Sequence, residues 1–437
     1  MNREMYKLSQ SQRTIYLQQL SGRDKDMARE TNTMGFYCYY PHNVSLAALE
    51  KCYNELIRRH NSLRLVFVKT LFGIRQYIGD FKYTHLETVR VNGKDGLMEF
   101  IDGAKDVMPV YILGGQSIRA VLVDCGAGAG ALVVRYNHLL TDGYSNGIIF
   151  GEFPKLYDSY SQGLEPPSEE WPSVRELWDY ERRYKNSEQY AIDKAYWHKK
   201  YYSQPNYSFP AGYRAKNEAC GVLRWSIEGE PVGKFTKLLE ETGATAQQQM
   251  MTIAAITVYA LTGDDNFAIT FLSANRRTPE MKRTVGCGYN ASPYFYNLDR
   301  EKPVRQLIAE NYKEYREVLR HSSFPTVAQI PMGWKLSIEH GMNFAHSWIT
   351  YSGMTQYNTV DNSEYDLSLI QRTANGSQFY LAFFDTPGKR FDMYLKYQLE
   401  RFSPEKVQKM QQVFLRCLDL VLQHPDWSID RIKENIG

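Results

Sequence analysis

Hydrophobic and polar positions change their spacing on either side of one short segment, residues 137–143. Before it, Ala131 to Tyr136 is a short, apolar, β-branched run, which predicts a buried strand. After it, Ser145 to Tyr160 carries apolar residues at helical spacing. Gly143 permits a tight turn between the two. The pattern therefore predicts a strand, a turn and a helix, with residues 137–143 on the connection.

Similar patterns predict further elements in the first half of the chain. We expect an amphipathic helix over Ser45 to Arg59, with Ser45 as its cap, and a strand over Leu63 to Val68. Arg119 to Asp124 and the run that begins at Ala131 are expected to form a hairpin around the glycine-rich residues 126–130.

Both halves of the chain mix helices and strands, which predicts an α/β fold of two lobes. Leu164 to Ser173 is rich in proline and acidic residues and lacks periodicity, so we expect a linker there. An N-terminal lobe is predicted over residues 1–170 and a C-terminal lobe over residues 171–437. Pro404 to Leu422 is a clear helix of the second lobe, with apolar residues along one side.

Composition is typical of a soluble globular protein. The 437 residues are 43% hydrophobic and 23% charged, with a formal net charge of +3. Acidic and basic residues are interspersed, so no nucleic-acid partner is indicated. The longest apolar stretch, Met250 to Leu261, is too short to span a bilayer and suits a core helix, and the N-terminus lacks a signal-like segment. We expect a cytoplasmic protein with no membrane partner.

The sequence contains no convincing metal or nucleotide motif. Six cysteines without a Cys-x-x-Cys pair argue against a zinc site and against a disulfide framework. Gly126-x-Gly128-x-x-Ala131 matches the dinucleotide fingerprint, but the fingerprint requires a helix to follow. Because a β-rich run follows here, we interpret the glycines as a hairpin loop.

The connection itself reads Asn137-His138-Leu-Leu-Thr-Asp142-Gly143. A histidine is well suited to moving a proton near neutral pH, and an aspartate nearby can orient its ring or brace the loop. The spacing alone is weak, because about half a His-x-x-x-Asp match is expected by chance among the nine histidines. A catalytic loop and a buried histidine that ties down a turn therefore both remain open. For His60 and His321, packing is the preferred interpretation.

Other short motifs stand in order with this one, from residue 6 to about residue 430. They are Leu8-Ser9-x-x-Gln12, with Tyr16 and Leu20; Arg59-His60-x-x-Leu63-Arg64-x-x-Phe67; Ala274-Asn275-Arg276 with Val285-Gly286-x-x-x-Asn290-x-x-Pro293; His321-Ser-Ser-Phe324-Pro325; and Tyr365-Asp366-Leu367-Ser368-Leu369. Together the six motifs resemble the condensation domain of nonribosomal peptide synthetases, within the chloramphenicol acetyltransferase-like superfamily. Each is weak alone, and their shared order makes the resemblance specific.

The resemblance implies two chloramphenicol acetyltransferase-like lobes in a V-shaped pseudodimer with a central tunnel. It implies an acyltransferase that forms an amide between a donor acyl thioester and the amine of a carrier-bound aminoacyl acceptor, without an acyl-enzyme. No permanently bound cofactor is expected, because the substrates travel on the phosphopantetheine of donor and acceptor carrier proteins, or on coenzyme A. An adjacent adenylation domain is the expected neighbour.

The resemblance also assigns roles to residues. His138 matches the catalytic histidine, which accepts the amine proton or hydrogen-bonds the amine or the intermediate. Asp142 and Gly143 match the other positions of the catalytic signature. The aspartate is expected mainly to support the site by pairing with an arginine of the C-lobe, best matched by Arg276, with Arg277 adjacent, and the glycine to leave room for substrate. At position 137 the family usually has histidine, whereas this chain has Asn137, which can also hydrogen-bond its own backbone.

Three interpretations stay open at this point. The first is the amide-forming acyltransferase: Met1 lies a few residues before the first motif, which fits a starter domain that N-acylates the first residue and also an elongating domain supplied in trans. A non-catalytic condensation-like domain that recruits other enzymes is the rival from another class; Asn137 favours it slightly, and intact His138, Asp142 and Gly143 argue against it. A stand-alone acyltransferase that forms esters is the third.

Overall fold

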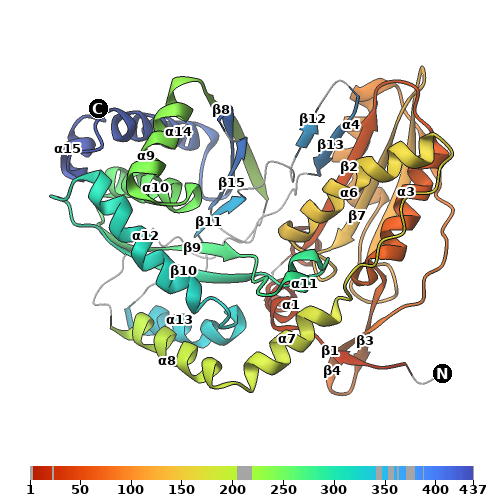
Figure 1. Ribbon diagram of the computed structural model, residues 1–437, viewed down its shortest axis with the longest axis horizontal. Coiled ribbons are helices and arrows are strands. Elements are labelled where there is room, and N and C mark those ends of the chain that lie inside the picture. The colour runs from red at the N-terminus through yellow and green to blue at the C-terminus, as the bar shows by residue number, and fades with distance from the viewer. Residues whose placement is uncertain are drawn as a thin grey trace. The chain divides into compact units, whose positions relative to one another are not determined.

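The predicted strand before the signature loop lies inside a six-stranded sheet. The computed structural model of the protein describes residues 3–21, 24–203, 219–340, 347–352, 359–361, 364–370, 379–386 and 388–436. In it, β7 (Ala129–Asn137) pairs antiparallel with β2 (Thr33–Tyr40) on one side and with β6 (Ile118–Gly126) on the other (Figure 1). Every residue of β7 is buried, as the apolar run predicts.

The contacts divide the chain into two units: unit 1 comprises Met1–Asn186, Ala274–Tyr289 and Gln356–Thr373, and unit 2 the remainder. The helices of unit 1 are α1 (Gln10–Ser21), α2 (Lys25–Thr31), α3 (Leu46–Arg59), α4 (Gly93–Asp102), α5 (Ala104–Val107), α6 (Gly143–Ser161), α7 (Arg175–Lys185) and α11 (Pro279–Arg283), with the short 3-10 helix η1 (Asn61–Arg64). Its other strands are β1 (Tyr6–Lys7), β3 (Leu65–Thr70), β4 (Gly73–Ile78), β5 (Thr88–Arg90), β12 (Thr359–Asp361) and β13 (Asp366–Leu369).

Helices cover both faces of the unit 1 sheet, whose strand order is β12-β13-β2-β7-β6-β5. The apolar sides of α3 and α6 pack on one face, where alternate residues of β2 and β7 such as Phe36 and Val134 join the same core. The intervening residues, such as Tyr37 and Val133, face α4. This period-two alternation is what a sheet buried on both sides requires.

Several local predictions for unit 1 are confirmed. The Ser45 hydroxyl accepts from the Ala48 N–H and caps α3. The predicted hairpin is formed by β6 and β7, and its turn uses Gly126, Ala127 and Gly128, all at positive φ. Because a strand and not a helix follows these glycines, they cannot present a helix N-terminus to a pyrophosphate.

The compact units differ from the predicted lobes of residues 1–170 and 171–437. Unit 1 includes α7 and also takes in two later segments, residues 274–289 and 356–373. The second of these places β13 antiparallel beside β2, with Asp366 opposite Tyr39. Linker composition marks a break in periodicity, and it carries no information about a distant strand that returns to the first sheet.

Unit 2 is built on a second sheet, of order β10-β9-β11-β14-β15-β8. Its helices are α8 (Glu188–Tyr202), α9 (Glu230–Thr242), α10 (Ala246–Thr262), α12 (Val304–Arg320), α13 (Thr326–His340), α14 (Pro404–Gln423) and α15 (Ile429–Glu434). Its strands are β8 (Cys220–Glu228), β9 (Asn266–Ser273), β10 (Asn290–Asn297), β11 (Ser347–Ser352), β14 (Phe379–Thr386) and β15 (Arg390–Gln398). The predicted core helix is α10, which contacts α9, α12 and α14. Among the described residues, no helix is long and apolar enough to cross a membrane.

Candidate active site

His138 lies on the turn that joins β7 to α6 and is partly exposed. Its backbone N–H donates to the Asn32 carbonyl oxygen at 2.8 Å, which holds the loop against the start of β2. Its ring Nδ1 lies 2.7 Å from the Thr141 carbonyl oxygen. A carbonyl can only accept, so Nδ1 carries the hydrogen and the neutral ring keeps its lone pair on Nε2.

Asn137 shapes the same turn from inside the protein. The residue is fully buried, and its Oδ1 accepts from the Leu139 N–H at 3.0 Å. This contact to the backbone two residues on is an Asx-turn, which gives the chain a reason to reverse direction here. Its backbone N–H donates to the Ser117 carbonyl oxygen at 2.8 Å. Asparagine at this position therefore supports the loop directly.

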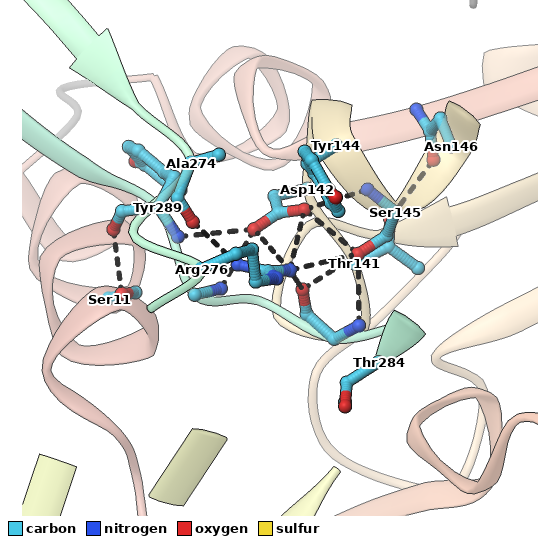
Figure 2. Close-up of polar contacts among 12 residues, drawn as sticks. Ser11, Thr141, Asp142, Tyr144, Ser145, Asn146, Ala274, Arg276, Thr284 and Tyr289 are labelled. Carbon is cyan, nitrogen blue, oxygen red and sulfur yellow. Dashed lines mark hydrogen bonds and ion pairs between the residues drawn. The ribbon is translucent and has the colours of Figure 1, made fainter. Parts of the chain in front are cut away.

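Asp142 is the N-cap of α6 and is almost completely buried. Its Oδ1 accepts from the backbone N–H and the hydroxyl of Ser145, at 3.0 and 2.8 Å. Its Oδ2 accepts from the N–H groups of Gly288 and Tyr289, at 2.9 and 3.1 Å (Figure 2). These contacts join the carboxylate to the start of α6 and to a distant segment of the chain, so they brace the loop.

Arg276 completes the coordination of this carboxylate. Its Nη2 lies 3.0 Å from Asp142 Oδ2 and 3.1 Å from Oδ1, and both side chains are nearly inaccessible to solvent. The same nitrogen donates to the Gly286 carbonyl oxygen at 2.8 Å, and Nη1 to that of Ala274 (Figure 2). A buried charge needs such partners, since removing one leaves the other uncompensated. The ion pair fixes the segment 274–289 to the start of α6.

Comparisons with known proteins identify the family of the chain. The family model described as Condensation domain matches residues 2–434. The chain belongs to the condensation domain family. This confirms the resemblance that the sequence motifs indicate.

Curated relatives of the condensation domain are peptide synthetases. The chain is 21% identical over 426 residues to a linear gramicidin synthase of Brevibacillus parabrevis, covering 89% of this chain and 8% of that protein. It is 19% identical over 440 residues to bacitracin synthase 1 of Bacillus licheniformis, covering 98% of this chain and 8% of the relative. The chain thus spans a small part of the length of these relatives.

Solved condensation domains share the fold. The starter condensation domain of rhizomide synthetase, in complex with C8-CoA, superposes with a TM-score of 0.80 at 18% identity, covering 98% of this chain and 96% of that one. The first condensation domain of the calcium-dependent antibiotic synthetase, in complex with a substrate analogue, gives a TM-score of 0.81 at 16% identity and 98% coverage of both chains.

Gly143, the last residue of the signature, has no conformational reason to be glycine in this condensation domain. Its φ is not positive, it is exposed, and a Cβ added there would meet no described atom within 4 Å. Gly288 is the opposite case, because a Cβ there would lie 2.3 Å from Nη1 of Arg276. Nothing in the packing of the described residues therefore requires glycine at position 143.

Three contributors to the site were not identified from the sequence. Ser145 Oγ contacts both Asp142 and the backbone of Gly286, and its signal is its place three residues after the helix cap. Gly288 has a weaker signal, a second glycine two residues after Gly286. Ser11, whose hydroxyl donates to the Tyr289 carbonyl oxygen at 2.7 Å, has no local signal because that contact joins residues far apart in sequence (Figure 2).

Two other reactive side chains of unit 1, Cys287 and His60, are buried. Burial raises the pKa of the Cys287 thiol well above its usual value, so this neighbour of Asp142 stays protonated and weakly nucleophilic. His60 is buried, with Nε2 2.5 Å from Glu152 Oε2, which fits the structural role expected for it. Within the described residues, no group of three or more histidine, cysteine, aspartate or glutamate side chains is arranged to hold a metal ion.

Proposed function

We propose that this condensation domain forms an amide between a donor acyl thioester and the amine of a carrier-bound aminoacyl acceptor. The observation that carries the proposal is the orientation of His138, whose Nδ1–H is engaged by the Thr141 carbonyl oxygen. In the neutral ring the lone pair is then on Nε2. A base fixed in one tautomer on a braced loop suits proton transfer.

The reaction needs one proton to move from nitrogen to sulfur. The acceptor amine attacks the thioester carbonyl carbon, a C–N bond forms, and the tetrahedral intermediate carries an oxyanion. His138 Nε2 hydrogen-bonds the attacking amine and accepts its proton. The C–S bond then breaks, and the proton passes to the departing thiolate. Holding two tethered substrates at this loop supplies much of the rate enhancement by proximity.

Gly143 fits the same proposal because it leaves space for substrate. The position is exposed, lies at the first residue of α6 and has open space around it. Substrate occupies that space, and the positive end of the helix dipole favours a developing oxyanion nearby. Asp142 and Arg276 contact the loop and each other, so the role proposed for Asp142 is support of the loop.

The test supplies a donor and an acceptor and looks for amide by mass spectrometry. Donors are offered as acyl-coenzyme A and as acyl-carrier protein, since a solved relative carries C8-CoA, and the acceptor is an aminoacyl-carrier protein. We expect product from the wild type and a loss of roughly 10²–10⁴-fold in kcat for His138→Ala. The control is His85→Ala, whose side chain is 89% exposed.

Three outcomes separate this proposal from its rivals. Equal product from wild type and His138→Ala would remove the role of His138. Product formed only with a soluble alcohol would favour the ester-forming alternative. No product with either donor, together with capture of a partner synthetase enzyme in a pull-down with purified components, would favour recruitment.

A further inference from the structure

The first turn of α1 contacts two parts of the candidate site at once. Gln12 Nε2 donates to the Leu139 carbonyl oxygen of the signature loop at 2.9 Å. Ser11 Oγ donates to the Tyr289 carbonyl oxygen at 2.7 Å (Figure 2). The side chains of both donors are buried, which limits competition from water. A single helical turn therefore sets the spacing between the loop that carries His138 and the backbone of Tyr289.

The N-terminus of α1 is itself held in place. The Gln10 N–H donates to both carboxylate oxygens of Glu181 on α7, at 2.8 and 3.0 Å. Within the first turn, the Ser9 N–H donates to Gln12 Oε1 at 2.8 Å, and the Gln12 N–H to Ser9 Oγ at 3.2 Å. These contacts satisfy N–H groups that a helix start otherwise leaves unpaired. The turn that presents Ser11 and Gln12 is thus well defined.

Both backbone polar groups of Tyr289 are held by side chains. Its N–H donates to Asp142 Oδ2 at 3.1 Å, and its carbonyl oxygen accepts from Ser11. Two fixed groups on one residue define the direction in which its side chain leaves the backbone. The Tyr289 ring lies against the imidazole of His138, with centroids 5.5 Å apart and 29° between the planes.

The Tyr289 ring gives the imidazole a contact of a different kind from its hydrogen bond. The hydrogen bond from Nδ1 to the Thr141 carbonyl sets the tautomer, but the torsion about Cβ–Cγ of a histidine has a broad energy well. A flat ring packed on one face restricts that rotation and aims Nε2. We propose that Tyr289 is a positioning residue that holds the imidazole plane of His138, with Ser11 fixing Tyr289 in turn. The proposal rests on the proposed function of His138.

Kinetics of three variants test the proposal. Tyr289→Phe keeps the ring and should keep kcat within about twofold, whereas Tyr289→Leu should lower kcat roughly tenfold or more with little change in KM. Ser11→Ala should lower kcat by an intermediate factor. The control, Ser159→Ala, removes an exposed hydroxyl-to-carbonyl contact elsewhere in unit 1 and should match the wild type. Thermal unfolding of each variant establishes that it is folded.

Nuclear magnetic resonance of ¹⁵N-labelled histidine gives a readout that needs no substrate. At a pH where His138 is neutral, the wild type and Tyr289→Phe should show the Nδ1–H tautomer. Tyr289→Leu should show a mixture of both, because a ring free to rotate breaks its hydrogen bond to the Thr141 carbonyl; His138→Ala assigns the signal. A Tyr289→Leu protein with wild-type kcat and tautomer would overturn the proposal, as would a Tyr289→Phe protein as impaired as Tyr289→Leu. If the wild type forms no amide but the tautomer shift occurs, the proposed function fails and the positioning role stands.

Discussion

Two histidines of this protein sit in similar surroundings and are held in different ways. His138 in unit 1 has an aromatic ring, Tyr289, against its face and an aspartate four residues away. His321, at the end of α12 in unit 2, has Tyr196 stacked on it at 3.9 Å and 16°, with Asp193 beside it. The same three kinds of side chain therefore occur at both places.

The hydrogen bonds to the rings make the difference. His321 Nδ1 lies 2.7 Å from Asp193 Oδ1, and Nε2 lies 3.3 Å from Glu317 Oε1. Both ring nitrogens of His321 are therefore engaged by carboxylate oxygens of its own unit. His138 contacts a neutral carbonyl through Nδ1, while its aspartate turns to Arg276. A catalytic base needs a ring nitrogen that can accept a proton, as proposed for His138. The contacts of His321 with Asp193 and Glu317 instead connect α8 to α12.

The largest effects are expected when the two histidines are replaced in parallel. His138→Gln should reduce kcat for amide formation by roughly 10²–10⁴-fold and change the free energy of unfolding by less than about 1 kcal/mol. His321→Gln should do the reverse, with stability lowered by roughly 1–3 kcal/mol, because the buried Asp193 loses one of its hydrogen-bond partners, and kcat per folded molecule unchanged. Urea unfolding and amide formation, measured on both variants, check this. Loss of turnover in a folded His321→Gln protein would contradict the comparison.

The next largest effect is expected for Asp142, which pairs with Arg276 and not with His138. Asp142→Ala should lower stability by about 3–5 kcal/mol, because Arg276 is left buried without its counter-ion, and α6 also loses its N-cap. The control is Asp179→Ala, which breaks an exposed ion pair with Arg182 and should cost less than about 1 kcal/mol. Urea unfolding measures both. Equal costs for the two variants would show that burial of the pair does not matter.

Local structure around this site could be predicted from the sequence, and its long-range contacts could not. The strand before His138 and the helix after Asp142 follow from the spacing of their apolar residues, and Ser45 was identified as a cap from its type and position. In contrast, β13 joins β2 across more than three hundred residues, and Ser11 meets Tyr289 with a sequence separation of 278. Such contacts depend on where whole elements pack, which no local pattern encodes.

The same distinction between local signals and long-range contacts applies to the residues of the candidate site. His138, Asp142 and Arg276 were identified by resemblance, because the family motifs mark them one by one. Gly288 and Ser145 were not, because each acts through a contact that only the folded chain brings together. The catalytic role of His138 stays a prediction.

The stability of unit 1 is expected to depend on pH near neutrality through Glu181 of α7. Burial raises the pKa of Glu181 to about 7, opposed by the Gln10 N–H and by the charges of Arg13 and Lys185. The folded state thus binds this proton more tightly than the unfolded chain, so stability falls as pH rises from about 4.5 to about 7, by at most about 3 kcal/mol.

Replacing the Glu181 carboxyl with an amide removes its contribution to the pH dependence of stability. Glu181→Gln keeps an acceptor for the Gln10 N–H and should be more stable than the wild type at pH 8, with the difference shrinking as pH falls and vanishing below about pH 4.5. The exposed Glu99→Gln should run parallel to the wild type. Unfolding free energies at several pH values decide. A Glu181→Gln curve parallel to that of the wild type would refute the assignment, and any pH dependence of kcat left in this variant belongs to other groups, His138 first among them.

The smallest effect on stability, and the sharpest contrast with activity, is expected at Gly143. Gly143 and Gly151 both lie in α6, are exposed, have no positive φ, and would place a Cβ where no described atom lies within 4 Å. Alanine should therefore stabilise the protein at either position, by up to about 1 kcal/mol, since glycine is the poorer helix former. Only Gly143→Ala should lower amide formation, because its methyl group enters space assigned to substrate beside His138, while Gly151→Ala should match the wild type. Equal activity of the two variants would mean that substrate does not approach the start of α6, and the placement of the reacting atoms beside His138 would then have to change.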